Sequence, residues 1–370
     1  MKKWLIVAMC LLLTGCWDRQ SLKALHMVDI IGIDQEKDAG NIHLNYVVSS
    51  LADAFQGGGK PDAHLYEAEN ENLFGAAALV ERQMPGAASL ANNRIYLLNR
   101  EFARHNPGTN LDFIGKIPAS PMLARVGIVD GSVGSLLKLE KIQGTTIPNI
   151  LVSMLNQAEQ RNSLVGIRLW ELILSKRNDF KDIAVPLIGL TKDNKIEIKG
   201  LSLFSDGSYS GIDLSPPQSV MLMTIDRYKK NQLLYINGEN ETFIVKVDKV
   251  KRSFSVIPGP DGIQKIIIPV RMEVQHISRG KMERPINQKD LAKFEKAMSE
   301  IMSVNAKKMI RLLQQAKCDY LGIGRYIYAN KPDLWMNMNW HETYPKLQIE
   351  PEFKVNIINS GIYDYQVEKE

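Results

Sequence analysis

One cysteine stands where its thiol could be modified covalently. Residues 11–20 read LLLTGCWDRQ, so Cys16 directly follows an apolar run. The stretch Leu13 to Cys16 resembles a bacterial lipobox, in which a diacylglycerol is attached to the cysteine thiol and the signal is cleaved just before it. A thiol is nucleophilic enough to take the lipid as a thioether, and the small residues Thr14 and Gly15 would fit a narrow peptidase cleft. We therefore expect cleavage between Gly15 and Cys16 and an S-diacylglycerol on Cys16, whose new amino group could also be acylated.

The residues before Cys16 have the three parts of an export signal. Lys2 and Lys3 are basic, the stretch from Trp4 to Leu13 is apolar, and small residues precede the cut. A spanning helix needs about 20 apolar residues, so residues 1–15 are too short for one. Two acyl chains hold a protein stably, since each buried methylene adds about 0.8 kcal/mol of membrane affinity. The alternative is an ordinary exported protein in which Cys16 is incidental.

The composition limits the classes of fold and function that the chain can have. Its 370 residues are 45% apolar and 24% charged, as in a globular protein of two or three domains. The net charge of +5 is spread without a long basic run, and two of the positive charges lie in residues 1–15. Nucleic-acid binding is therefore not expected, because it requires a clustered basic face. Only Cys318 would remain beside a lipidated Cys16, so no disulfide within the chain is expected.

The chain shows no recognisable catalytic, cofactor or metal site. No histidine lies at metal-ligand spacing from another histidine or a cysteine. Asp34, Glu36 and Asp38 alternate like calcium ligands, but the loop lacks the central glycine and closing glutamate of an EF-hand, which favours a solvated turn. The stretch from Gly207 to Gly211 has the frame of a nucleophile elbow with tyrosine, not serine, at its centre. Cys318 is expected to be a buried thiol, and the protein is not expected to be an enzyme.

The first half of the chain alternates predicted strands and helices. This alternation is typical of an α/β module, which we place at residues 16–195. Hydrophobic periodicity predicts strands at 28–33, 42–49, 94–99 and 124–129, and helices at 73–83, 133–139, 147–160 and 167–174.

The second half, residues 196–370, changes to hairpins and one long helix, and could subdivide near residue 235. Alternation predicts strands at 196–204, 209–214, 243–250, 266–274 and 347–357. The helix at 288–317, with Asn287 as its N-cap, has a methionine-rich apolar face. That face could form a groove for a partner, but packing on its own sheet is favoured. Pro351 is expected to point outward from a sheet edge.

The expected fold class is therefore α+β: a multi-domain, mixed α/β protein with antiparallel sheets and a long C-terminal amphipathic helix. Four stretches further make the chain resemble the Ger(x)C (GerAC-like) family, the lipoprotein C subunits of spore germinant receptors. They are Cys16-Trp17-Asp18-Arg19 with Leu22; Asn92 to Ile95 through Glu101 to Ala103; Lys199 to Phe204 with Gly211; and Asp319 to Gly324 with Pro332 and Trp335. Ser21 and the stretch from Lys116 to Pro121 depart from the family pattern.

The resemblance implies a three-domain mixed fold, attachment to the outer leaflet of the spore inner membrane, and assembly with two integral membrane subunits, A and B. It implies neither catalysis nor a cofactor. We hypothesise a non-enzymatic, lipid-anchored receptor subunit that is required for the germination response. The helix at 288–317 and the segment from Gly322 to Trp340 are the candidate contact surfaces. Trp335 and Trp340 could anchor an interface, because tryptophan buries a large area and keeps a polar group, or could belong to the core.

The alternative function is a lipid-anchored extracytoplasmic solute-binding protein. That function would require a cleft between two similar α/β lobes, and the two halves of this chain differ in character. A lipid-anchored cell-wall enzyme is a third candidate, and the chain offers it no recognisable acid–base pair.

Overall fold

The computed structural model describes most of the chain beyond residue 24. Residues 1–24, which include Gly15 and Cys16, lie outside the described residues, as does Asn287. The described ranges are 25–37, 40–49, 63–117, 120–139, 141–142, 144–177, 181–227, 230–238, 242–260, 262–279, 288–336 and 338–359.

A nine-stranded mixed sheet occupies the first part of the described chain. Its strand order is β11-β10-β9-β6-β5-β1-β2-β3, and the short β4 pairs with β1. The bounds are β1 (Leu25–Gln35), β2 (Ile42–Ser49), β3 (Ala63–Asn70), β4 (Ala87–Ser89), β5 (Ile95–Asn99), β6 (Arg125–Val129), β9 (Ala184–Leu190), β10 (Ile196–Ser205) and β11 (Ser208–Leu214).

The middle of this sheet is parallel and its flanks are antiparallel. β1, β5, β6 and β9 run in one direction, while β2, β3, β10 and β11 pair antiparallel. The central strands are nearly continuously buried, as expected for parallel strands that are covered on both faces. The connecting elements are α3 (Leu73–Gln83), α4 (Arg100–Arg104), α5 (Pro107–Leu111), η3 (Asp112–Lys116), α6 (Val133–Leu137), β7 (Lys141–Ile142), β8 (Thr145–Thr146), α7 (Ile147–Gln160), α8 (Leu169–Leu174) and η4 (Ser175–Arg177).

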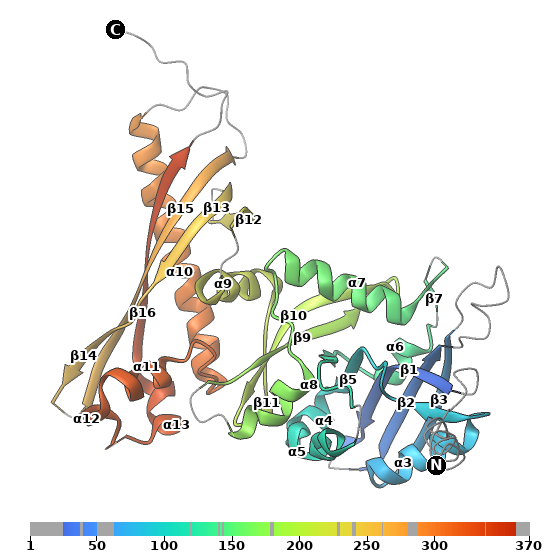
Figure 1. The fold of residues 1–370 in the computed structure, drawn as a ribbon. Coiled ribbons are helices and arrows are strands. Elements are labelled where there is room, and N and C mark those ends of the chain that lie inside the picture. Colours follow the sequence, from blue (N-terminus) through green and yellow to red (C-terminus); the bar gives the residue numbers. More distant parts are fainter. Residues whose placement is uncertain are drawn as a thin grey trace, which may run out of the picture.

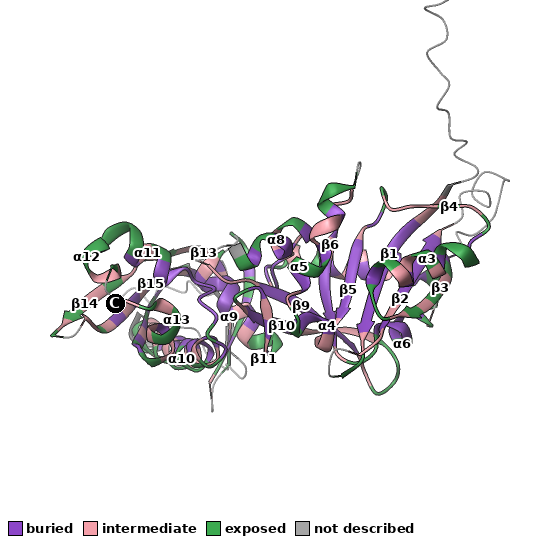
Figure 2. Cartoon of the chain, turned by 90° about the horizontal axis from the view of Figure 1, so that it is seen from below, coloured by how far each residue is buried: buried purple, intermediate pink, exposed green. Residues whose placement is uncertain are grey.

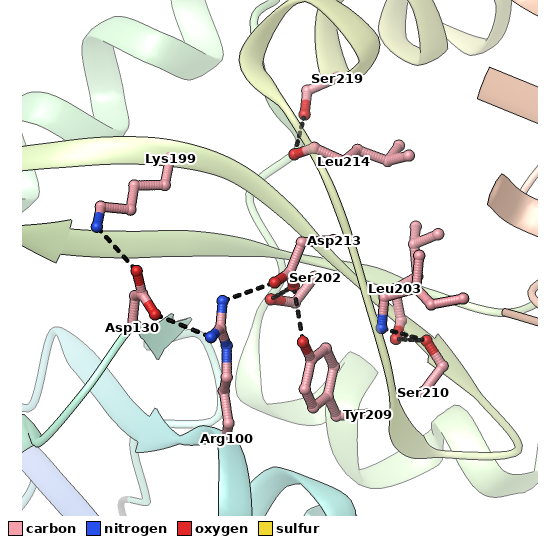
Figure 3. Close-up of polar contacts among 11 residues, drawn as sticks. Arg100, Asp130, Lys199, Ser202, Leu203, Tyr209, Ser210, Asp213, Leu214 and Ser219 are labelled. Carbon is pink, nitrogen blue, oxygen red and sulfur yellow. Dashed lines mark hydrogen bonds and ion pairs between the residues drawn. The ribbon is translucent and has the colours of Figure 1, made fainter. Parts of the chain in front are cut away.

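The sheet continues across the predicted domain limit at residue 195. β10 pairs with β9 from Ile196 to Leu203, so the β10–β11 hairpin extends the sheet of the first half. A polar network reinforces this join (Figure 3): Arg100 lies 2.8 Å from Asp130 and 2.6 Å from Asp213. The division of the chain into two independently folding units at residue 195 therefore stays a prediction.

A five-stranded sheet follows, joined to the first by α9 (Pro216–Asp226). Its order is β12-β13-β15-β14, with β16 parallel to β15 on the other side. Figure 1 shows the two sheets side by side along the molecule, with α10 running beside the second. The elements are β12 (Gln232–Asn237), β13 (Thr242–Arg252), β14 (Ser255–Gly259), β15 (Gly262–Arg279), α10 (Gln288–Gln315), α11 (Ile323–Asn330), α12 (Pro332–Trp335), α13 (Trp340–Thr343), η5 (Tyr344–Lys346) and β16 (Gln348–Asn359).

The methionine-rich face of α10 packs on its own sheet, as predicted. Met298, Met302 and Met309 are at most 1% exposed and belong to the hydrophobic core. Figure 2 shows buried strands in both sheets, with exposed outer sides on α11 and α12. The fold thus confirms the predicted class, a mixed α/β protein with a long C-terminal amphipathic helix.

α10 also covers the outer edge of β16. Ser303 Oγ accepts the backbone N–H of Phe353, Ser299 Oγ that of Val355, and Glu295 Oε1 that of Ile357, at 2.7–3.0 Å. Three helix positions four residues apart thus satisfy the alternate edge groups that would otherwise be free to pair with another strand.

Pro351 was expected at a sheet edge pointing outward, and only the first part is correct. It lies on the edge strand β16, but it is buried. The cause is the period of two: Pro351 has the same parity as Ile349 and Phe353, so it shares their inward face.

Candidate functional site

The described residues include two of the predicted site residues, Trp335 and Trp340. Both are half-buried and pack against the core at the end of the molecule formed by α11, α12 and α13. The lipidation site Cys16 and the cleavage position Gly15 lie outside the described residues.

Four rings form a row from the surface to the core, which we call the aromatic row: Tyr328, Trp335, Trp340 and Tyr344. Neighbouring ring centroids are 5.8, 5.8 and 5.4 Å apart, within the range of favourable aromatic pairs. Tyr344 is buried, and its hydroxyl donates to the Cys318 carbonyl at 3.1 Å. Tyr328, at the outer end, is 52% exposed, and Met336, which follows Trp335 in the sequence, is 75% exposed.

Asp319 fixes the inner part of this row. Its carboxylate accepts the backbone N–H groups of Ile323 and Gly324, at the start of α11, and the indole N–H of Trp340 at 3.1 Å. Asp319 is only 3% exposed, so these three donors replace the water that the carboxylate loses. Trp340 is therefore held in place from inside, whereas Trp335 lies one ring farther out.

Gly324 makes the approach of Trp340 possible. A Cβ at this position would lie 2.5 Å from the Trp340 Nε1 atom, a distance that no real contact of this kind shows. The second glycine of the Asp319 to Gly324 stretch is thus required because the ring packs directly on the backbone.

A second acidic residue joins three distant segments beneath the same loop. Asp182 accepts the backbone N–H of Asp319 at 2.8 Å and that of Asp206, in the β10–β11 turn, at 3.2 Å. Burial raises the pKa of Asp182 to about 7 and that of Asp319 to about 6, although their hydrogen bonds act in the opposite direction. Both carboxyl groups line a cavity of about 290 Å³ that Lys181, Lys317 and His341 also border.

Other sequence predictions are confirmed or corrected in this structure. Cys318 is a buried thiol, as expected, and burial raises its pKa.

The turn at 34–38 was predicted to be solvated, which is wrong for Asp34. That residue is 8% exposed, and its carboxylate accepts the N–H groups of Val133 and Gly134. It lies at the carboxyl end of a parallel strand and holds α6 there.

The comparisons with known proteins agree with one another. A model described as the spore germination protein N-terminal domain matches residues 18–190, and a model described as spore germination B3/GerAC-like, C-terminal, matches residues 199–361. The spore germination protein KC of Bacillus subtilis (strain 168) is 22% identical over 393 residues, covering 97% of this chain and 95% of that protein. The crystal structure of the GerBC protein shares the fold, with a TM-score of 0.57 at 14% identity, covering 89% of this chain and 97% of that chain.

Proposed function

Because the chain belongs to the GerAC-like family of spore germination proteins, we propose that it is a non-enzymatic subunit of a nutrient germinant receptor, required for the germination response. The observation that carries the proposal is the extent of the match. The two domain models together account for residues 18–190 and 199–361, almost the whole chain after Cys16. The spore germination protein KC, a curated relative, also aligns over nearly its full length.

A lipid on Cys16 would hold this subunit on the extracytoplasmic face of the spore inner membrane. The lipobox-like stretch and the export signal before it support this part of the proposal. Within the residues that the structure describes, no helix is both long enough and apolar enough to cross a membrane.

Integral membrane A and B subunits would be the protein partners. The outer end of the aromatic row supports a contact there, because Trp335 and the exposed Tyr328 and Met336 combine apolar area with polar groups. Tryptophan and tyrosine at such a place cost little conformational entropy on binding, since their inner neighbours already fix the segment.

The lipid anchor can be tested with two cysteine substitutions. Spores carrying Cys16→Ala should lose incorporation of labelled fatty acid into the protein and respond poorly to nutrients. Cys10→Ala is the matched control, because Cys10 lies in the apolar part of the export signal, six positions before Cys16. This variant should retain both properties. A Cys16→Ala protein that still incorporated the label, or spores that germinated normally with it, would refute the anchor.

The partner surface can be tested by co-purification from spore membranes. Trp335→Ala should reduce recovery of integral membrane proteins with the tagged chain by about tenfold or more, the loss expected for an interface residue worth at least 1.4 kcal/mol. Trp170→Ala is the control, since Trp170 is also a partly exposed tryptophan, 42%, but lies on α8. Equal recovery with both variants would exclude the aromatic row from the interface.

The solute-binding alternative finds less support in the fold. It requires two similar α/β lobes around a cleft, whereas the described residues form one nine-stranded mixed sheet and one dissimilar five-stranded sheet.

A further inference from the structure

Three potential metal ligands converge at one corner of the nine-stranded sheet, far from the aromatic row. Glu36 follows β1, His43 is the second residue of β2, and Glu69 lies near the end of β3. His43 is directly opposite Glu69 in the β2–β3 ladder and directly opposite Asp34 in the β1–β2 ladder. Two of the three ligands therefore sit on a regular sheet, where side chains are positioned more accurately than on loops.

The distances suit a small cation. His43 Nε2 lies 3.4 Å from Glu36 Oε1, and His43 Nδ1 lies 3.5 Å from Glu69 Oε2. With one ligand atom taken from each residue, all three lie within 4.8 Å of one another. Ligand atoms about 2.0–2.2 Å from a tetrahedral zinc ion are about 3.3–3.6 Å apart. Only one ring nitrogen of His43 can bind the ion, so the exposed glutamate at the other nitrogen must turn toward it.

The charge balance is compatible with a bound cation. Among the described residues, neither Glu36 nor Glu69 forms an ion pair with lysine or arginine; both contact His43, and Glu69 Oε1 also accepts a hydrogen bond from Asn41 Nδ2 at 2.6 Å. The neighbouring Glu67 is paired with Lys138 at 3.1 Å. Two carboxylates on either side of one imidazole repel each other unless a positive charge, on a bound cation or on the imidazole itself, lies between them.

A cavity of about 580 Å³ adjoins the three ligands at the carboxyl ends of β1 and β5. Its wall includes Asn99, Ser132 and Gln35. The side-chain oxygen of Gln35 is buried and has no hydrogen-bond partner among the described residues, so an acceptor on this wall is unused. A metal with three protein ligands keeps a coordination position for water, which such an acceptor could orient.

We propose that Glu36, His43 and Glu69 form a binding site for a divalent transition-metal cation of the zinc class. Imidazole nitrogen with two carboxylates is a ligand set for such metals, whereas calcium and magnesium prefer oxygen ligands alone. The site lies on the first sheet and does not depend on the receptor role.

Calorimetric titration of the full chain in detergent micelles, with any affinity tag removed and EDTA washed out, tests the site with zinc chloride at pH 7.5. One equivalent should bind, and His43→Ala should weaken binding at least tenfold, with Glu36→Gln and Glu69→Gln each weakening it measurably. Glu352→Gln, an exposed glutamate on β16, should leave it unchanged. Circular dichroism should show all four variants folded, since the substituted side chains are at least 40% exposed at the proposed site.

Three outcomes would overturn the proposal. They are no zinc binding above buffer, zinc binding that His43→Ala leaves intact, and calcium binding as strong as zinc binding. The second would assign the metal to other groups such as the thiols, which all of these variants retain. The third would mean that the carboxylates act alone as a hard-cation surface.

Discussion

At the scale of single residues, Asp182 and Asp319 are the groups with the most unusual chemistry. Burial raises the pKa of both carboxyl groups, although each also accepts hydrogen bonds from backbone N–H groups. A carboxylate usually gains from such bonds, so desolvation outweighs them here. The folded protein therefore holds protons that the unfolded chain would release.

This difference predicts that stability falls as pH rises. An unfolded aspartate loses its proton near pH 3.9, whereas Asp182 keeps it up to about pH 7. Between these values the native state binds more protons, so the free energy of unfolding decreases with pH, by on the order of 4 kcal/mol for Asp182 alone. Urea denaturation at pH 5, 6, 7 and 8 should show this decline, and Asp182→Asn should flatten it. Identical pH slopes for both proteins would contradict the assignment.

The sequence predicted the surroundings of some residues and not of others, for a physical reason. The buried state of Cys318 followed from its position at the end of an apolar helix. The burial of Asp34 and the cluster around His43 did not follow, because both depend on which strand lies beside which. His43 and Glu69 are 26 positions apart in the sequence and directly opposite in the β2–β3 ladder.

At the scale of elements, the turn at the end of α10 determines the direction of the loop that leads to α11. The N–H of Lys317 donates to the Gln314 carbonyl, and the N–H of Cys318 donates to the Leu313 carbonyl, which is the Schellman pattern. Lys317 has a φ of 53°, a conformation usually given to glycine. The turn directs the chain so that Asp319 reaches α11.

Replacing Lys317 by glycine should therefore stabilise the protein. Relief of the left-handed conformation is worth about 1–2 kcal/mol, partly offset by the greater entropy of glycine in the unfolded chain, which costs about 0.5–1 kcal/mol. We expect a gain of about 0.5–1 kcal/mol in urea denaturation. Lys317→Ala is the control, since alanine keeps the strain while removing the same charge, and it should give no gain. Stabilisation by both substitutions would point to the charge instead.

Most of the predicted helices and strands are present because they depend on local periodicity and capping. Their limits shift, as in β15, which extends over Gly262–Arg279 instead of 266–274, and β3 and β9 were not predicted. The predicted helix at 288–317 ends at Gln315 in the structure, where the turn begins. The strand predicted at 347–357 is β16, but the contacts of its outer edge with α10 were not predictable. Ser299 and Ser303 are polar residues in a helix, and nothing in their spacing reveals that they face strand N–H groups.

At the scale of the whole molecule, the two sheets share more than a connecting chain. β10 belongs to the first sheet although it follows the predicted limit at residue 195, and Asp182 bonds to Asp319 across 137 positions. Strand order cannot be read from one sequence, because the apolar pattern of a strand indicates which of its faces are buried and not which strand lies beside it. The family resemblance predicted the fold class, but it did not predict that β10 extends the sheet of the first half.

We expect the two halves to unfold together. Trp170 reports on the first sheet, and Trp335 and Trp340 report on the second. Variants that lack Trp4 and Trp17 and retain only Trp170, or only Trp335 and Trp340, can therefore be compared. Their urea transitions, followed by fluorescence, should have the same midpoint, as a cooperative unit requires. Midpoints that differed clearly would support independent units divided near residue 195.

The junction around Asp182 also imposes an order in time. A chain made from its amino end completes β1 to β11 before the loop at Asp319 exists, and β16, which must lie beside β15, arrives last. Until that moment Asp182 lacks the Asp319 N–H and the part of its cover that the C-terminal half supplies. Closure of the C-terminal half should therefore be accompanied by proton uptake at Asp182, so that closure is thermodynamically more favourable at mildly acidic than at alkaline pH.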